Sequence, residues 1–167
     1  LLTGPSSLNV FGGGGVSNTT SRLYQALVEK ELAVGVDGGL SATIDPYLYE
    51  ITLTVHPQRS AEEVLKAVDH EILQVLNEKV SEADVKRAIK QARALFAYGT
   101  ENITNQGFWL GYADMFDSYA WFETYIKRLE TITPEDVLNA AQRYLSPSRR
   151  VVGIYTPDNN YNEGQTL

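Results

Sequence analysis

Histidine is the first residue type to consider, because two histidines close together on one helix face commonly hold a catalytic zinc ion. The sequence contains only His56 and His70, and neither has a second histidine three or four residues away. His56 ends an alternating apolar segment just before Pro57, and His70 lies between two acidic residues of a predicted helix. We therefore predict two solvated surface histidines and no metal ligand in this chain.

Nucleophilic catalysis has no better basis in the sequence. Cysteine is absent, which excludes disulfides, thiolate catalysis and cysteine zinc sites together. No Gly-x-Ser-x-Gly elbow occurs. Neighbouring carboxylates such as Glu62 and Glu63 lie in the first turn of a predicted helix, where the helix dipole favours acidic residues. We predict no catalytic residue and no self-contained active site.

The glycine run Gly12–Gly15 precedes a predicted helix, and such a loop can bind phosphate through backbone N–H groups. A phosphate-binding loop also needs a lysine followed by serine or threonine after its last glycine. Here Gly15 is followed by Val16-Ser17-Asn18. We interpret the run as a structural turn rather than a nucleotide site.

Composition narrows the class of protein and of partner. The 167 residues, 43% hydrophobic and 21% charged, are typical of one soluble globular domain. No apolar run approaches the roughly 18–20 residues that a membrane span needs. The formal charge of −7 disfavours nucleic acid, and the basic residues of 86–93 are interpreted as the solvated flank of a helix. The sequence does not decide between the cytoplasm and the periplasm of a bacterium.

A β-hairpin is the clearest element. Small and apolar residues alternate over 34–44, Asp45-Pro46 marks a turn, and strict alternation continues over 47–55. Gly38-Gly39 predicts a bulge or a close backbone approach. We expect two antiparallel strands with one apolar face.

Helices are predicted before and after this hairpin in the sequence. We predict helices from a cap at Asn18, Thr19 or Thr20 to 32–33, from Ser60, from Ser81, once or twice within 108–126, and from Thr133 to Leu145. The predicted buried faces comprise Leu65, Val68, Ile72, Val75 and Leu76 in one helix and Val85, Ala88, Ile89, Ala92, Leu95 and Phe96 in the next.

The ends of the chain are assigned to shorter elements. Residues 1–11 are interpreted as the end of a helix, 151–155 as a final short strand, and 158–167 as a polar tail. The whole order predicts an α+β fold, an antiparallel sheet with helices packed on one face, in a single domain over 1–157.

Aromatic residues are dense near the middle of the chain. They recur at spacings of three and four: Phe108, Trp109, Tyr112, Phe116, Tyr119, Trp121, Phe122 and Tyr125. We interpret most of them as core packing, and the remainder as a surface for a partner lobe or a peptide.

Three segments together resemble one protein family. Residues 13–27 read Gly-Gly-Gly-Val-Ser-Asn-Thr-Thr-Ser-Arg-Leu-Tyr-Gln-Ala-Leu, residues 132–137 read Ile-Thr-Pro-Glu-Asp-Val, and Leu145-Ser146-Pro147 leads to Val151-Val152-Gly153. Their order and spacing are similar to those of pitrilysin/insulinase-family zinc peptidases, which include the mitochondrial processing peptidases. The resemblance covers 12–157.

The resemblance implies a two-lobed peptidase whose related α+β lobes close on a peptide. In that family one lobe carries His-x-x-Glu-His, in which two histidines bind zinc and the glutamate activates water. This sequence lacks the motif, so it resembles the non-catalytic lobe, with the first strand of the lobe expected before Leu1. The resemblance implies zinc in a partner catalytic lobe of the same or another chain, a peptide substrate, a homo- or heterodimer, and no activity of this chain alone.

One departure from the family pattern concerns substrate binding. Active members often supply an arginine and a tyrosine from this lobe, and these positions correspond to Val28 and approximately Val34. Valine cannot donate a hydrogen bond to a substrate carbonyl, so the resemblance implies that this clamp is lost. A non-proteolytic scaffold subunit, as in the core proteins of respiratory complexes, stays an alternative, and a stand-alone hydrolase with an unrecognised site is a third.

Overall fold

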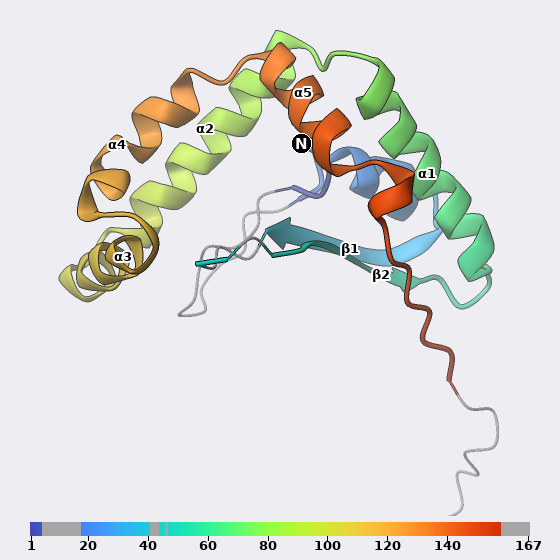
Figure 1. Cartoon of the computed structure of the whole chain (residues 1–167). Helices are drawn as coiled ribbons and strands as arrows, with labels where there is room; N and C mark the ends of the chain where they lie inside the picture. Colours follow the sequence, from blue (N-terminus) through green and yellow to red (C-terminus); the bar gives the residue numbers. More distant parts are fainter. Residues whose placement is uncertain (5–17, 41–43, 46, 158–167) are drawn as a thin grey trace, which may run out of the picture.

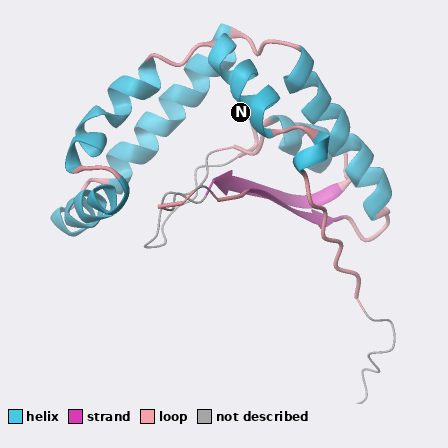
Figure 2. Ribbon diagram, viewed as in Figure 1, coloured by secondary structure: helices cyan, strands magenta, loops and turns pink. Residues whose placement is uncertain are grey.

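The computed structural model describes residues 1–4, 18–40, 44–45 and 47–157. Along the chain the elements are η1 (Tyr24–Val28), β1 (Ala33–Leu40), β2 (Tyr49–Val55), α1 (Ala61–Asn77), α2 (Glu82–Gly99), α3 (Ile103–Phe116), α4 (Tyr119–Glu130), α5 (Pro134–Tyr144) and η2 (Pro147–Arg149). Figures 1 and 2 show helices combined with a small two-stranded sheet. The predicted α+β class is confirmed.

Strands β1 and β2 form the predicted antiparallel hairpin, with Val36 opposite Leu53 and Leu40 opposite Tyr49. The alternation in β2 places Ile51, Leu53 and Val55 half-buried toward the core, while the residues between them are exposed. A register shift interrupts β1 between residues 33 and 35. The predicted irregularity therefore lies nearer the start of the strand than Gly38-Gly39.

The close backbone approach, which was the alternative prediction for Gly38-Gly39, is found at Gly38. A Cβ atom at Gly38 would lie 2.7 Å from the carbonyl oxygen of Glu50 and 2.7 Å from Cγ2 of Thr3. The hydroxyl of buried Thr3 donates to the Gly38 carbonyl at 3.3 Å and lies 2.7 Å from the hydroxyl of Tyr49. Only glycine fits here because two other segments occupy the space of a side chain.

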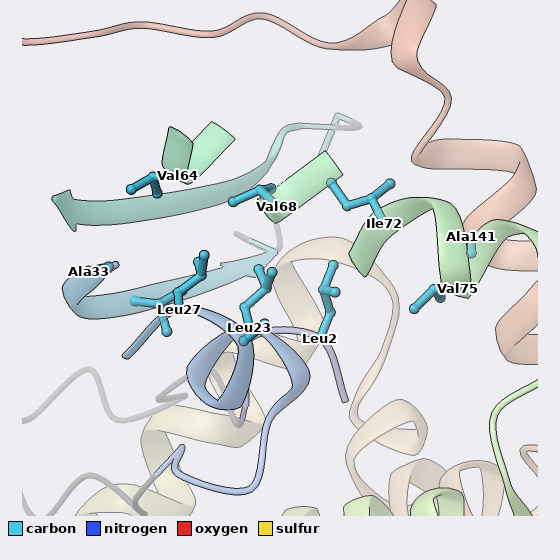
Figure 3. Close-up of a cluster of buried hydrophobic side chains, with 11 residues drawn as sticks. Leu2, Leu23, Leu27, Ala33, Val64, Val68, Ile72, Val75 and Ala141 are labelled. Atoms are coloured by element: carbon cyan, nitrogen blue, oxygen red, sulfur yellow. The ribbon is translucent and has the colours of Figure 1, made fainter. Parts of the chain in front are cut away.

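The hydrophobic core lies between the inner face of the hairpin and the helices η1, α1 and α5 (Figure 3). Its fully buried large side chains are Leu23, Leu27 and Val64. The predicted stripe of α1 is confirmed at Val68, Ile72 and Val75, which are buried, whereas its other two leucines are half-buried. We call this part of the molecule (η1, β1, β2, α1 and α5) the sheet body.

Local capping explains where the helices begin. The Ser60 hydroxyl accepts from the Glu63 amide at 3.1 Å, and the Ser81 hydroxyl accepts from the Asp84 amide at 3.1 Å. In α5 the Thr133 side chain accepts from the Asp136 amide, and the Asp136 carboxylate accepts from the Thr133 amide, which completes a capping box. The three predicted starts are confirmed because each cap satisfies an otherwise free N–H group.

Helices α2, α3 and α4 form an arm that extends away from the sheet (Figure 1). The aromatic segment contains two helices, one of the two predicted arrangements. Of the predicted buried face of α2 only Val85 is buried, and the rest is half-buried. The prediction that helices pack on one face of the sheet therefore holds for the sheet body and not for this arm.

The helix predicted to run to 32–33 is much shorter than expected. Helical structure covers 22–28, mostly as the π-helix η1, and Ser21 rather than residues 18–20 caps it, accepting from the Tyr24 amide at 3.3 Å. Glu31 then adopts a left-handed backbone with φ 57°. Residues 29–32 favour helix by propensity, but Ala33 already pairs with Val55, so tertiary structure ends the helix first.

The final strand predicted at 151–155 is wrong for this structure. Residues 151–157 are extended in Figure 1 but belong to no strand, because no described strand lies beside them to supply backbone partners. Val151 and Tyr155 are each 95% exposed. At the other end, residues 1–4 are not helical, contrary to the prediction; the glycine run and 158–167 lie outside the described residues.

No helix within the described ranges combines the length and the apolarity that crossing a bilayer requires.

Candidate functional site

The two histidines lie on different elements and make different contacts. His56 follows β2, and its Nδ1 accepts from the Gln58 amide at 3.3 Å. His70 is exposed on α1, with Nε2 3.0 Å from Nε2 of Gln74. Within the described part of the chain, no three histidine, cysteine or acidic side chains form a group that could hold a metal ion. Neither histidine lies in a catalytic arrangement.

The two positions implied for substrate clamping lie on different elements. Val28 ends η1 and packs, half-buried, against the core. Val34 lies in the irregular part of β1 and is 59% exposed. Neither side chain contains a hydrogen-bonding atom.

A polar cleft of about 580 Å³ lies where η1, α1 and α2 approach one another. It is lined by Leu1, Thr20, Arg22, Gln25, Ala26, Glu29, Lys30, Glu71, Asp84 and Arg87. Two ion pairs lie in it. Arg22 lies 3.8 Å from Glu71 and also donates to Oε1 of Gln74 at 3.2 Å, and Arg87 pairs with Asp84. Gln91 of α2 donates to Thr20 at 3.2 Å and so links the arm to the sheet body.

Asp84 is the most constrained carboxylate of the cleft. The Ser81 hydroxyl donates to it at 2.7 Å, and this hydrogen bond, together with Arg87 at 2.6 Å, holds the pKa of Asp84 below its usual range. An ionised carboxylate paired in this way stabilises the start of α2 and the neighbouring guanidinium. The Ser81 hydroxyl bound to Asp84 also caps α2, so what the cleft presents is a set of charged and polar groups.

Sequence reasoning missed this cleft. Arg22 belongs to the Ser-Arg-Leu-Tyr segment used for the resemblance, but its partner Glu71 is far away in sequence. The sequence alone does not distinguish the charged residues of α1 and α2 that face η1 from those that face solvent. Only the packing of α1 on η1 brings the two together.

Comparison with known proteins places the chain in a family. Residues 8–92, just over half of the chain, match the family model described as "Peptidase M16 inactive domain". No curated protein is similar enough to the sequence to count as a match.

Solved structures agree with this assignment. A structure titled "putative zinc protease" from Bordetella pertussis Tohama I has a TM-score of 0.74 and 26% identity, over 84% of this chain and 78% of that one. The "Inactive Peptidase Domain of a Putative Zinc Protease" from Bordetella parapertussis has a TM-score of 0.77 and 24% identity, over 88% and 80%.

A third structure shares the fold at lower identity. This "protease from Helicobacter pylori" has a TM-score of 0.73 and 14% identity, over 88% of this chain and 37% of that longer chain. The family match and the α+β fold agree with the resemblance to the pitrilysin/insulinase peptidases. The chain belongs to the family of M16 peptidase inactive domains.

Proposed function

We propose that this chain is the non-catalytic lobe of a two-lobed zinc metallopeptidase, and that it packs on a His-x-x-Glu-His lobe and helps to enclose peptide substrates. The observation that carries the proposal is the match of residues 8–92 to the inactive-domain family. Zinc and the activated water belong, in this proposal, to the partner lobe. This lobe contributes surface rather than chemistry.

Exposed apolar side chains support the packing role. One set lies where β1 connects to β2, and its members Leu40, Ile44, Tyr47 and Leu48 are all 59–73% exposed. The segment after η2 carries a second set, Val151, Ile154 and Tyr155. Large apolar groups in such numbers are costly in water and typical of surfaces that another domain covers.

The substrate clamp is absent in this proposal. Val34 is exposed but has no donor, and Val28 is half-buried against the core, so neither can hold a substrate carbonyl by a hydrogen bond. The lobe therefore limits access to the zinc site by shape, and substrate orientation depends on the catalytic lobe or on another subunit.

Zinc content and peptide hydrolysis test the proposal in two steps. The purified chain, after dialysis, should contain almost no zinc and should not cleave a denatured protein substrate. Addition of the catalytic lobe of the same enzyme should give a complex whose hydrolysis rate exceeds that of the catalytic lobe alone.

Other results would contradict the proposal. Stoichiometric, tightly held zinc in this chain alone would require His56 or His70 as a ligand and would overturn the assignment as a zinc-free lobe. A stable complex without any peptidase activity would instead support the scaffold alternative.

A further inference from the structure

The arm joins the sheet body through two short connections at one of its ends. Residues 78–81 lead from α1 into α2, and residues 131–133 lead from α4 into α5. Figure 1 shows both connections at the end of the arm opposite α3. Lys79 of the first connection forms an ion pair with Glu135 at the start of α5, so the two connections are held near each other. We call these two connections the hinge, because domain motions concentrate in a few residues at the ends of rigid elements.

Contacts inside the arm join its three helices to one another. The ring of Phe96 in α2 lies 5.0 Å from the ring of Phe122 in α4. The indole N–H of Trp109 in α3 donates to the carbonyl of Gly99 at the end of α2, at 3.0 Å. Helix α3 also packs on α4. Since each helix contacts the other two, we expect the arm to keep its shape when it moves.

The attachment of the arm to the sheet body is weaker. Val80 and Val85 are buried at the base of the arm, but the main hydrophobic cluster contains no described side chain from residues 82–130. Farther along α2, the side-chain amide of Gln91 donates to the hydroxyl of Thr20 across the polar cleft, at 3.2 Å. This hydrogen bond is exposed, and water competes for both of its groups. It is therefore easily broken and re-formed.

We propose that the arm swings as one unit about the hinge, and that the hydrogen bond between Gln91 and Thr20 holds the closed position described above. In the closed position the first turns of α2 supply one wall of the polar cleft, through Asp84 and Arg87. Rotation of α2 away from η1 breaks the hydrogen bond and widens the cleft, while the ion pair at the hinge persists. This motion lies inside the lobe and is separate from the packing of one lobe on another.

Distances between two spin labels test the inference in the full chain. The sequence contains no cysteine, so pairs of introduced cysteines are labelled specifically. Thr52→Cys with Glu123→Cys measures the arm against the sheet body, and Lys90→Cys with Glu123→Cys measures α2 against α4 within the arm; all three residues are exposed. Double electron–electron resonance should give two distances, or one broad distribution, for the first pair and a single narrow distance for the second.

A hydrogen-bond variant links the motion to Gln91. In the chain labelled at residues 52 and 123, Gln91→Ala should raise the population at the longer distance by about two- to fivefold, which corresponds to ~0.5–1 kcal/mol for one hydrogen bond. Gln142→Ala is the matched control. It removes a hydrogen bond to the Leu76 carbonyl, 3.1 Å long, that lies wholly within the sheet body, and should leave the distribution unchanged.

Three results would overturn the inference. The first is a single narrow distance between the labels at 52 and 123 that Gln91→Ala does not change. The second is an equally broad distribution within the arm, because the arm would then be losing its structure rather than swinging; far-UV circular dichroism checks that the helices are retained. The third is an equal response to Gln91→Ala and Gln142→Ala, which would indicate general loosening of the chain.

Discussion

The sheet body and the helical arm use the same kinds of residue but reach different degrees of burial. The main hydrophobic cluster lies in the sheet body, together with Leu2 and Leu23 beside it, and includes side chains with no exposed surface. In the arm, α4 has no buried residue, and the described side chains of α2 and α3 include only three buried ones, Val85, Trp109 and Ala113. Aromatic rings of the arm contact one another instead, as Phe96 does with Phe122 at 5.0 Å.

This difference indicates two modes of stabilisation. The sheet body is stabilised mainly by removal of apolar surface from water. The arm depends on helix propensity, caps, ring contacts and a few ion pairs, which are individually weak. Burial raises the pKa of half-buried Tyr125 in the arm, so partial shielding from water occurs there too.

The largest effect should come from a cavity in the sheet body. Leu27→Ala removes a side chain with 0% exposure and should lower the free energy of unfolding by about 2–5 kcal/mol. Leu129→Ala in half-buried α4 should cost about 1 kcal/mol or less. Urea unfolding followed by circular dichroism measures the free energy of unfolding of both variants. Equal losses would show that burial stabilises the two regions to the same extent.

A pair of strand glycines gives the next test. Gly38→Ala forces a Cβ against the Glu50 carbonyl and Thr3, and should cost about 1–3 kcal/mol. Gly35→Ala places its Cβ where nothing lies within 4 Å, and should be neutral or slightly stabilising. Thermal unfolding of the two variants side by side measures the difference. A tolerated Gly38→Ala would mean that the Thr3 segment moves away at little cost.

Helix caps should contribute less. Thr133→Ala removes the capping box of α5 and should cost about 1 kcal/mol. Ser118→Ala is the matched control in the arm, because Ser118 makes no side-chain capping bond to α4. The free energy of unfolding of the Ser118→Ala variant should stay within about 0.5 kcal/mol of that of the parent chain. A larger loss at Ser118 would show that the arm depends on an interaction other than capping.

The smallest effect should be a dependence of the free energy of unfolding on pH, caused by the capping carboxylates of both regions. Hydrogen bonds from Thr133 lower the pKa of Asp136, as those from Ser81 lower the pKa of Asp84. A carboxyl whose folded pKa lies below its unfolded value stabilises the fold fully above the unfolded pKa of 3.8. That contribution is lost as pH falls from 3.8 through the lower folded pKa.

Unfolding titrations at pH 6 and at stepwise lower pH measure this effect. Asp136→Asn should flatten the acid limb of the stability curve, because the amide cannot titrate. An unchanged acid limb would show that other carboxylates determine it.

The sequence predicted which helices and strands form better than it predicted where they end and what they pack against. Alternation over 47–55 and caps at Ser60, Ser81 and Thr133 are local signals, and each gave a correct element. The end of η1 depends on pairing between Ala33 and Val55, which no local propensity reports. Likewise, the apolar residues 151–155 have the composition of a strand but no described neighbour with which to pair.

The candidate site was less predictable than the fold. His70 is exposed, as predicted from its isolation in the sequence, whereas His56 is half-buried. The contacts of Arg22 with Glu71 and Gln74 depend on helices packing across the chain. The aromatic segment was interpreted mostly as core. Trp109 alone among its described aromatic side chains is buried, because α3 and α4 pack mainly on each other.

Thr3 and Asn18 have a consequence for how the sheet can extend. Their side chains donate to the carbonyl groups of Gly38 and Val36, two alternate residues of β1 that point to the same side. A strand arriving at that side would have to break both bonds, whereas β2 presents no comparable obstruction among the described residues. These two side-chain hydrogen bonds therefore protect β1 from edge-to-edge aggregation.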